Sequence, residues 1–201
     1  MKRLALVAAA VSAALLLAGC TTNDGLAAEY AEGSTKNYIS GDGNIEVFEG
    51  DARGAAVSYT SETTSGDPID SADFLGSVTV LNFWYASCAP CRVEAPILAE
   101  LNDEYSTEGV NFLGVNVRDQ AVTAENFEKE TGITYPSAID TNDGNILFAF
   151  AATNTVSANA VPTTLVIDRE GRVAARILGQ IETERTLGTI LDSVLAEDEG
   201  N

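Results

Sequence analysis

Apolar residues form two nearly continuous runs in the middle of the chain, at residues 77–85 and 110–117. Such runs are typical of strands that are buried on both faces of a sheet. Residues 160–168 form a loop that leads into a third apolar run, and a turn at residues 170–171 separates it from a fourth run at residues 173–178. The last two runs therefore predict a hairpin.

Four other segments predict helices, at residues 91–106, 123–131, 145–152 and 183–196. The first and the last carry apolar residues at helical spacing along one face. Pro96 lies inside the first segment and should kink that helix, because proline cannot donate a backbone hydrogen bond. Thr123 is the expected N-cap of the second helix.

The signals are weaker before the first buried strand. Residues 45–48 predict a short strand, residues 56–60 an edge strand, and residues 69–76 a short helical turn. Together with the later elements, the order strand, helix, strand, helix, hairpin, helix predicts an α/β fold. Because parallel strands need crossover connections, we expect a mixed central β-sheet flanked by helices on both faces.

Composition divides the chain into three parts. We predict a signal peptide at residues 1–19, a flexible acidic and polar tether at residues 20–54, and a globular domain at residues 55–198. The signal peptide begins with Lys2 and Arg3, and an apolar run follows them. That run is too short to span a membrane comfortably, as expected for a secretory signal.

The apolar run ends in Leu17-Ala18-Gly19-Cys20, which resembles a bacterial lipobox. The resemblance implies cleavage before Cys20 and attachment of a diacylglycerol to its sulfur. An ordinary signal peptide with an unused cysteine is the alternative. Lipidation would anchor the mature protein outside the cytoplasmic membrane, and it would leave the other two cysteines of the chain as a pair.

The charge of the chain narrows the range of partners. The 30 acidic and 11 basic residues give a formal net charge of −19 at pH 7. Binding to nucleic acid needs clustered lysine and arginine, so this composition argues against nucleic acid as a partner. An acidic surface that keeps the protein soluble is the simplest interpretation.

Cys88 and Cys91 stand two residues apart, between a predicted strand and a predicted helix. At the start of a helix this spacing lets the sulfurs form a disulfide, and the unpaired N–H groups and the helix dipole stabilise a thiolate on the first cysteine. Pro90 suits the first turn, where its missing N–H would have no partner. We predict reversible thiol–disulfide exchange, with Cys88 as the exposed nucleophile and Cys91 as the buried resolving thiol.

Other uses of two cysteines fit the sequence less well. A structural disulfide stays open, although such a short loop contributes little stability. The chain has no histidine and no second cysteine pair of this spacing, which argues against zinc. Arg92 stands where covalent haem attachment would need histidine, and Tyr85 stands where a peroxidase would have Thr or Ser. We predict no cofactor and no metal site.

The cysteine motif and its surroundings resemble the thioredoxin superfamily, and more closely the extracytoplasmic TlpA/ResA-type disulfide reductases. One matching segment runs from Val80 through the cysteine pair to Pro96, and a second is Val-Pro-Thr-Thr-Leu-Val-Ile-Asp at residues 161–168. The resemblance covers roughly residues 55–195 and implies a thioredoxin-like fold. One departure is Ser87, which stands where many relatives have tryptophan, and this smaller side chain is expected to change access to Cys88.

The resemblance implies roles for residues around the cysteines. Pro162 would follow a cis peptide bond and face the disulfide, so that the backbone at Val161 could align a partner polypeptide. Glu94, three residues after Cys91, would tune the thiol pKa values and move protons, the alternative being a solvated helix carboxylate. Trp84 and Pro90 are likewise expected to tune the cysteines or to face the substrate.

The resemblance also implies an enzyme that acts on exported protein thiols and disulfides. A TlpA/ResA-like reductase would take electrons from a membrane thiol carrier of the CcdA/DsbD type and reduce exported disulfides, including apocytochrome cysteines in cytochrome c maturation. Two alternatives stay open: a disulfide-forming oxidase or isomerase of the same fold, and a non-catalytic Cu(I)-binding or delivery protein that uses the two thiols. The redox potential decides the direction of electron flow.

Overall fold

The computed structural model describes residues 38–39, 44–153, 156 and 160–197. The predicted signal peptide, Cys20 and most of the predicted tether lie outside these residues. Within the described residues, no helix combines the length and the apolar character that a membrane span requires.

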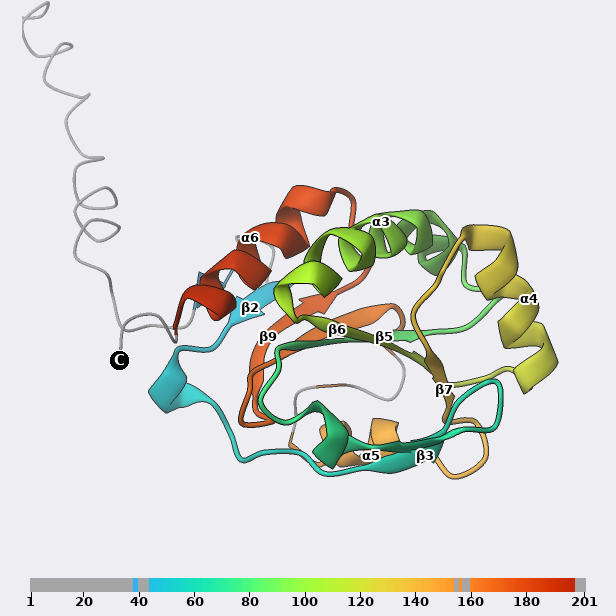
Figure 1. Ribbon diagram of the computed structural model, residues 1–201, viewed down its shortest axis with the longest axis horizontal. Helices are drawn as coiled ribbons and strands as arrows, with labels where there is room; N and C mark the ends of the chain where they lie inside the picture. Colours follow the sequence, from blue (N-terminus) through green and yellow to red (C-terminus); the bar gives the residue numbers. More distant parts are fainter. Residues whose placement is uncertain (1–37, 40–43, 154–155, 157–159, 198–201) are drawn as a thin grey trace, which may run out of the picture. The chain divides into compact units, whose positions relative to one another are not determined.

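Seven of the described strands form one mixed sheet in the order β1-β2-β9-β8-β5-β6-β7 (Figure 1). The strand β5 is parallel to β6, and β6 to β7, whereas β8 is antiparallel to both β5 and β9. This sheet confirms the predicted mixed α/β fold. Its strands are β1 Tyr38–Ile39, β2 Ile45–Val47, β5 Thr79–Trp84, β6 Asn111–Asn116, β7 Ser137–Ile139, β8 Thr163–Ile167 and β9 Val173–Leu178.

Helices cover the sheet on both sides, and a separate two-stranded hairpin lies on one of these sides. Figure 1 shows α3 and α6 on one side, with α4 next to α3 near β7, and α5 and the β3–β4 hairpin on the other side. Short 3-10 turns connect several of these elements. The bounds are β3 Thr60–Glu62, β4 Pro68–Asp70, α3 Ala89–Tyr105, α4 Ala121–Thr131, α5 Asn145–Ala151, α6 Glu184–Ala196, η1 Gly50–Ala52, η2 Ser71–Phe74 and η3 Ser106–Glu108.

The central strand β5 is buried along its whole length, and its side chains enter cores on both faces of the sheet. Val80 belongs to the core that contains Leu98 of α3 and Leu191 of α6. Phe83 belongs to the opposite core, where its ring lies 6.2 Å from that of Phe150 on α5. This alternation follows from the period of two in a strand. The end of β5 therefore leads directly from the core to the start of α3.

The predicted edge strand at residues 56–60 is wrong. Only Thr60 belongs to a strand, and β3 pairs with β4 further along the chain. The backbone N–H of Tyr59 donates to the Ser71 hydroxyl at 3.1 Å, and that of Val57 donates to the carbonyl of Gly171 at 3.0 Å. The apolar pattern is present, but these hydrogen bonds go to a side chain and a turn instead of a neighbouring strand.

Two helix starts also differ from the prediction. Gln120 occupies the N-cap position of α4, so the prediction that Thr123 is the N-cap is wrong. Thr123 lies inside the first turn, where its N–H donates to the carbonyl of Gln120 at 2.9 Å. The helix α3 begins at Ala89, two residues earlier than expected, and Cys88 occupies its N-cap position. The cysteine motif is therefore part of the helix start.

The sheet includes residues that we expected to belong to the tether. Strand β2 pairs antiparallel with β9, and Ile45 and Val47 pack against the core under α3 and α6. Arg53 then forms an ion pair with Asp168, at the end of β8. The short strand predicted at residues 45–48 is confirmed by β2, and its pairing with β9 shows that it belongs to the sheet of the domain and not to the tether.

Candidate active site

Cys88 and Cys91 form a disulfide at the start of α3, with their Cα atoms 5.2 Å apart. The Cys88 sulfur accepts a hydrogen bond from the backbone N–H of Cys91 at 3.2 Å, so it takes the place of a capping side chain. Pro90 lies in the first turn, where its missing N–H costs no intrahelical bond. In the reduced state, this N–H group and the helix dipole would stabilise a Cys88 thiolate.

Both sulfur-bearing residues are nearly inaccessible in this disulfide form. Cys88 is 3% exposed and Cys91 is 1% exposed. The expected contrast between an exposed nucleophile and a buried resolving thiol is therefore small. Ser87 and Ala89, on either side of Cys88, are exposed. Because both side chains are small, they leave room for a partner to approach Cys88 from the surface.

Trp84 forms the floor of the site at the end of β5. Its ring stacks on Phe127 of α4, with a centroid distance of 4.4 Å, and both belong to the apolar cluster that contains the two cysteines. The backbone of Gly114 passes close beneath the indole: a Cβ atom there would lie 2.8 Å from Trp84 Nε1. The glycine makes room for the tryptophan, which the sequence pattern alone did not indicate.

Asp119 holds the loop that leads to Cys88. Its carboxylate accepts hydrogen bonds from the backbone N–H of Ala86 at 2.6 Å and from the Asn116 side chain at 2.9 Å. The side-chain oxygen Oδ1 of Asn116 in turn accepts hydrogen bonds from the backbone N–H groups of Arg118 and Asp119. Sequence reasoning assigned Asp119 no role, since acidic residues are frequent in this chain. The parallel pairing of β5 and β6 brings the two strand ends together.

Glu94 is completely buried, one helical turn after Cys91. Its carboxylate accepts hydrogen bonds from the Asn82 side chain at 2.8 Å and from the backbone N–H of Ile181 at 2.9 Å. Burial raises the pKa of Glu94 to about 7, and these two hydrogen bonds oppose that rise. The alternative of a solvated helix carboxylate is therefore wrong, and the group can change protonation near neutral pH.

The peptide bond between Val161 and Pro162 is cis, as the resemblance implied. Val161 is partly buried and packs against the cluster that contains Trp84 and both cysteines. Pro162 is buried, and its carbonyl accepts a hydrogen bond from the backbone N–H of Gly179 at 2.9 Å. Residues from distant parts of the chain thus meet at the disulfide.

Two arginines flank the cysteine loop, and sequence reasoning did not single them out as site residues. The Arg118 guanidinium lies over the ring of Tyr85, 4.1 Å from its centroid. Arg92 lies 5.4 Å from the centroid of Phe127 and forms an exposed ion pair with Glu130 at 3.3 Å. Cation–π contacts at such sites contribute about 0.5–1 kcal/mol each.

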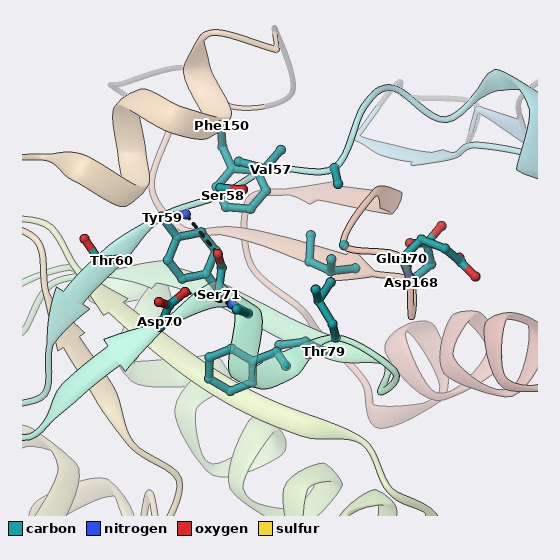
Figure 2. A pocket seen from close by; sticks show the side chains of 16 residues that line it. Val57, Ser58, Tyr59, Thr60, Asp70, Ser71, Thr79, Phe150, Asp168 and Glu170 are labelled. Carbon is teal, nitrogen blue, oxygen red and sulfur yellow. Dashed lines mark hydrogen bonds between the residues drawn. The ribbon is translucent and has the colours of Figure 1, made fainter.

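A cavity of about 420 Å³ lies away from the cysteines (Figure 2). Its walls include Tyr59, Phe150 and Thr79, and Thr79 lies at the opposite end of β5 from Trp84. Burial raises the pKa of Tyr59 above its usual range. Neither cysteine lines this cavity, so it is not part of the redox site. Within the described ranges, no group of three or more His, Cys, Asp or Glu side chains is arranged to hold a metal ion.

Comparison with known proteins identifies similar chains. Residues 49–191 match the family described as Redoxin. The thiol-disulfide oxidoreductase ResA of Bacillus subtilis is 32% identical over 124 residues, which cover 62% of this chain and 65% of that protein. The match thus spans just under two thirds of this curated relative.

Solved structures give broader coverage. A DsbF homologue from Corynebacterium diphtheriae is 32% identical, with a TM-score of 0.67, and the match covers 80% of this chain and 99% of that one. A secreted thiol-disulfide isomerase from Corynebacterium glutamicum is 29% identical, with a TM-score of 0.69, and the match covers 81% and 99% of the two chains.

Proposed function

The chain belongs to the Redoxin family, and from this premise we propose that it is an extracytoplasmic thiol–disulfide oxidoreductase that acts on exported proteins. The observation that carries the proposal is the Cys88–Cys91 disulfide at the start of α3, packed against Val161 next to the cis Pro162. Similarity to a thiol-disulfide oxidoreductase and to a secreted thiol-disulfide isomerase supports both the chemistry and the compartment.

In the reducing direction, the Cys88 thiolate attacks one sulfur of a partner disulfide. A mixed disulfide forms, and the partner's other sulfur leaves as a thiolate, which takes up a proton. The Cys91 thiolate then attacks the Cys88 sulfur, releases the second partner thiol and closes the Cys88–Cys91 disulfide. The partner gains two electrons and two protons, and this protein loses them.

Glu94 is suited to assist the second step. Cys91 must lose its proton before it attacks, and a buried carboxylate with a pKa of about 7 can accept a proton close to neutral pH. The hydrogen bonds from Asn82 and Ile181 hold the carboxylate in place in the core. Trp84 and Pro90 shape the cluster and the helix start on which the two sulfurs lie.

The preferred direction is reduction, as in a TlpA/ResA-like protein that receives electrons from a membrane thiol carrier of the CcdA/DsbD type and supports cytochrome c maturation. Equilibration of the full chain with glutathione buffers, followed by thiol labelling, tests this. A potential near about −270 mV would support a reductase, and one near about −120 mV would support a disulfide-forming oxidase or isomerase. A pair that does not titrate reversibly would mean a structural disulfide and would reject exchange chemistry.

Serine variants test the two roles. Cys91→Ser should accumulate mixed disulfides between Cys88 and partner proteins, because the resolving thiol is missing. Cys88→Ser should form none and should lose turnover. The reverse pattern would exchange the roles of the two cysteines. A Cu(I) competition titration of the reduced protein separates redox exchange from the Cu(I)-delivery alternative, which requires tight binding by both thiolates.

We also propose that residues 1–19 are a signal peptide and that Cys20 carries a lipid anchor. In a host that lipidates exported proteins, the full chain should incorporate labelled fatty acid and fractionate with membranes. Cys20→Ala should lose the label and move to the soluble fraction, whereas Cys88→Ala should keep both properties. Label retained by Cys20→Ala would reject this anchor and leave the redox proposal untouched.

A further inference from the structure

Arg118 is held in a fixed position at the edge of the loop that leads to Cys88. Its guanidinium lies 4.1 Å from the centroid of the Tyr85 ring, and the carbonyl of Tyr85 accepts a hydrogen bond from the N–H of Cys88 at 3.1 Å. The Arg118 backbone N–H donates to the Asn116 side chain at 3.1 Å. Tyr85 packs against the apolar cluster that contains both cysteines, so its ring and the backbone hydrogen bond hold this cation next to that cluster.

The charge of Arg118 is available to a partner. Its side chain is exposed, and it forms no ion pair with any residue that the structure describes. The neighbouring Asp119 carboxylate accepts hydrogen bonds from the N–H of Ala86 and from the Asn116 side chain through its Oδ2 atom, and it forms no ion pair with Arg118 in the described structure. Arg92, the other arginine at this site, is already paired with Glu130. Arg118 is thus the cation beside the cysteines that can still bind a carboxylate.

We infer that Arg118 recognises a carboxylate that lies next to the reactive cysteine of the partner polypeptide. This inference rests on the proposed function, because it concerns the substrate of the same disulfide. Arginine binds a carboxylate through two parallel hydrogen bonds, and stacking on an aromatic ring pre-orders its planar group. The preferred substrates are accordingly exported disulfides with Asp or Glu beside the attacked cysteine.

The net charge of the chain predicts the opposite preference. A charge of −19 repels acidic partners at long range, although salt screens such effects beyond about 8 Å at physiological ionic strength. A preference for an acidic partner therefore requires a local cation at the contact. The net charge of the chain therefore cannot by itself produce faster reaction with an acidic partner.

The test uses three short peptides that each contain one intramolecular disulfide and differ only in Asp, Asn or Lys beside the first cysteine. The reduced full-length protein is mixed with each peptide, the reaction is quenched with acid, and the products are separated by chromatography. Each rate is divided by the rate with dithiothreitol, which is uncharged and corrects for the intrinsic reactivity of the peptide. At physiological ionic strength, where the long-range repulsion is screened, we expect the Asp peptide to react about 5- to 10-fold faster than the Lys peptide.

Variants identify the source of the preference. Arg118→Gln should bring the Asp-to-Lys ratio to one or below, because the remaining net charge favours the Lys peptide. Arg118→Glu should lower the ratio further, and Arg118→Lys should keep only a weaker, salt-sensitive part of the preference. Arg185→Glu is the matched control, because Arg185 is an exposed arginine on α6, away from the cysteines, and the charge change is the same. It should leave the ratio unchanged.

The outcomes separate this inference from the proposed function. Equal rates for the three peptides, a faster Lys peptide with the unmodified protein, or a ratio that survives Arg118→Gln would overturn the role of Arg118 and leave thiol–disulfide exchange intact. If none of the peptides is reduced, while the disulfide of the protein itself titrates, the proposed activity on polypeptides is rejected as well.

Discussion

At the scale of single residues, the least expected environment is that of Glu94. A carboxylate with no exposed surface is costly to ionise, and two hydrogen bonds offset only part of that cost. The folded protein therefore holds a proton on Glu94 at pH values where the unfolded chain has lost it. Protonation stabilises the folded state here, so stability should fall as the pH rises from about 4.5 to about 7.

Glu94→Gln should remove this pH dependence. The glutamine amide can replace the neutral carboxyl group if the Asn82 side-chain amide rotates. The side-chain oxygen of Asn82 can then accept a hydrogen bond from the glutamine NH₂ group and another from the Thr164 hydroxyl. Between pH 5 and pH 8, the free energy of unfolding of the unmodified protein should fall by about 2–3 kcal/mol more than that of the variant. Urea unfolding of the oxidised protein at both pH values measures the difference. Parallel pH profiles of the two proteins would contradict the raised pKa.

Gly114→Ala tests the close packing beneath Trp84. The added Cβ would overlap the Ser137 hydroxyl and would lie 2.8 Å from the indole nitrogen, so strand β6 or the tryptophan must move. We expect a loss of about 1–3 kcal/mol in unfolding free energy. A change in Trp84 fluorescence should accompany it, and the signal is unambiguous because the chain has one tryptophan.

Gly54→Ala is the control for this substitution. A Cβ at Gly54 would meet no atom within 4 Å, so the variant should be neutral or slightly stabilising. If Gly114→Ala is equally neutral, the indole does not depend on the glycine for its space.

At the scale of elements, the sequence predicted most of what builds the site and little of what supports it. The apolar run of β5, the cysteine spacing and the helix that follows are local signals, so they could be recognised directly. The hydrogen bonds that Glu94 and Asp119 accept join residues that are between 12 and 87 positions apart, and no local pattern identifies such pairs. The prediction of a strand at residues 56–60 is wrong for the same reason: an extended segment becomes a strand only if another strand lies beside it, and the local sequence does not show that.

The helix α5 shows a supporting contact of this kind. Asp140 is buried, and its carboxylate accepts hydrogen bonds from the N–H groups of Ile146 and Leu147, both at 2.9 Å. These donors belong to the first turn of α5 and would otherwise lack partners. Through Ile146 and Phe150, the same helix packs against β5 in the core that contains Phe83. Asp140 thus connects a turn after β7 to the packing of the central strand.

Asp140→Ala should destabilise the protein by about 1–2 kcal/mol, because two N–H groups at a helix start lose their acceptor. Asp143→Ala is the matched control, since Asp143 is an exposed acidic residue of the same turn. Urea unfolding measures both variants. Equal stability of the two would mean that the Asp140 carboxylate does not hold α5.

At the scale of the whole molecule, the position of residues 44–54 changes how the domain is understood. Composition assigned them to a tether, yet β2 extends the sheet beside β9. The Arg53 side chain is 2% exposed; it donates to the carbonyl of Phe48 at 3.0 Å and pairs with Asp168 at 3.0 Å. Asp168 also accepts hydrogen bonds from Arg172 and from the backbone of the β8–β9 turn. The segment is therefore tied to the hairpin that carries β8.

A chain that starts at residue 55 should be less stable than one that starts at residue 38. The shorter chain leaves one edge of β9 unpaired, uncovers Ile177 of β9, and removes one of the two cations that neutralise the buried Asp168. Breaking a buried ion pair costs about 3–5 kcal/mol, and Arg172 should compensate for part of this. We expect the chain from residue 55 to lose about 3 kcal/mol in urea unfolding, with Arg53→Met in the longer chain accounting for about half of it. Equal unfolding midpoints for the two chains would place the start of the domain at residue 55, because residues 38–54 would then contribute nothing to its stability.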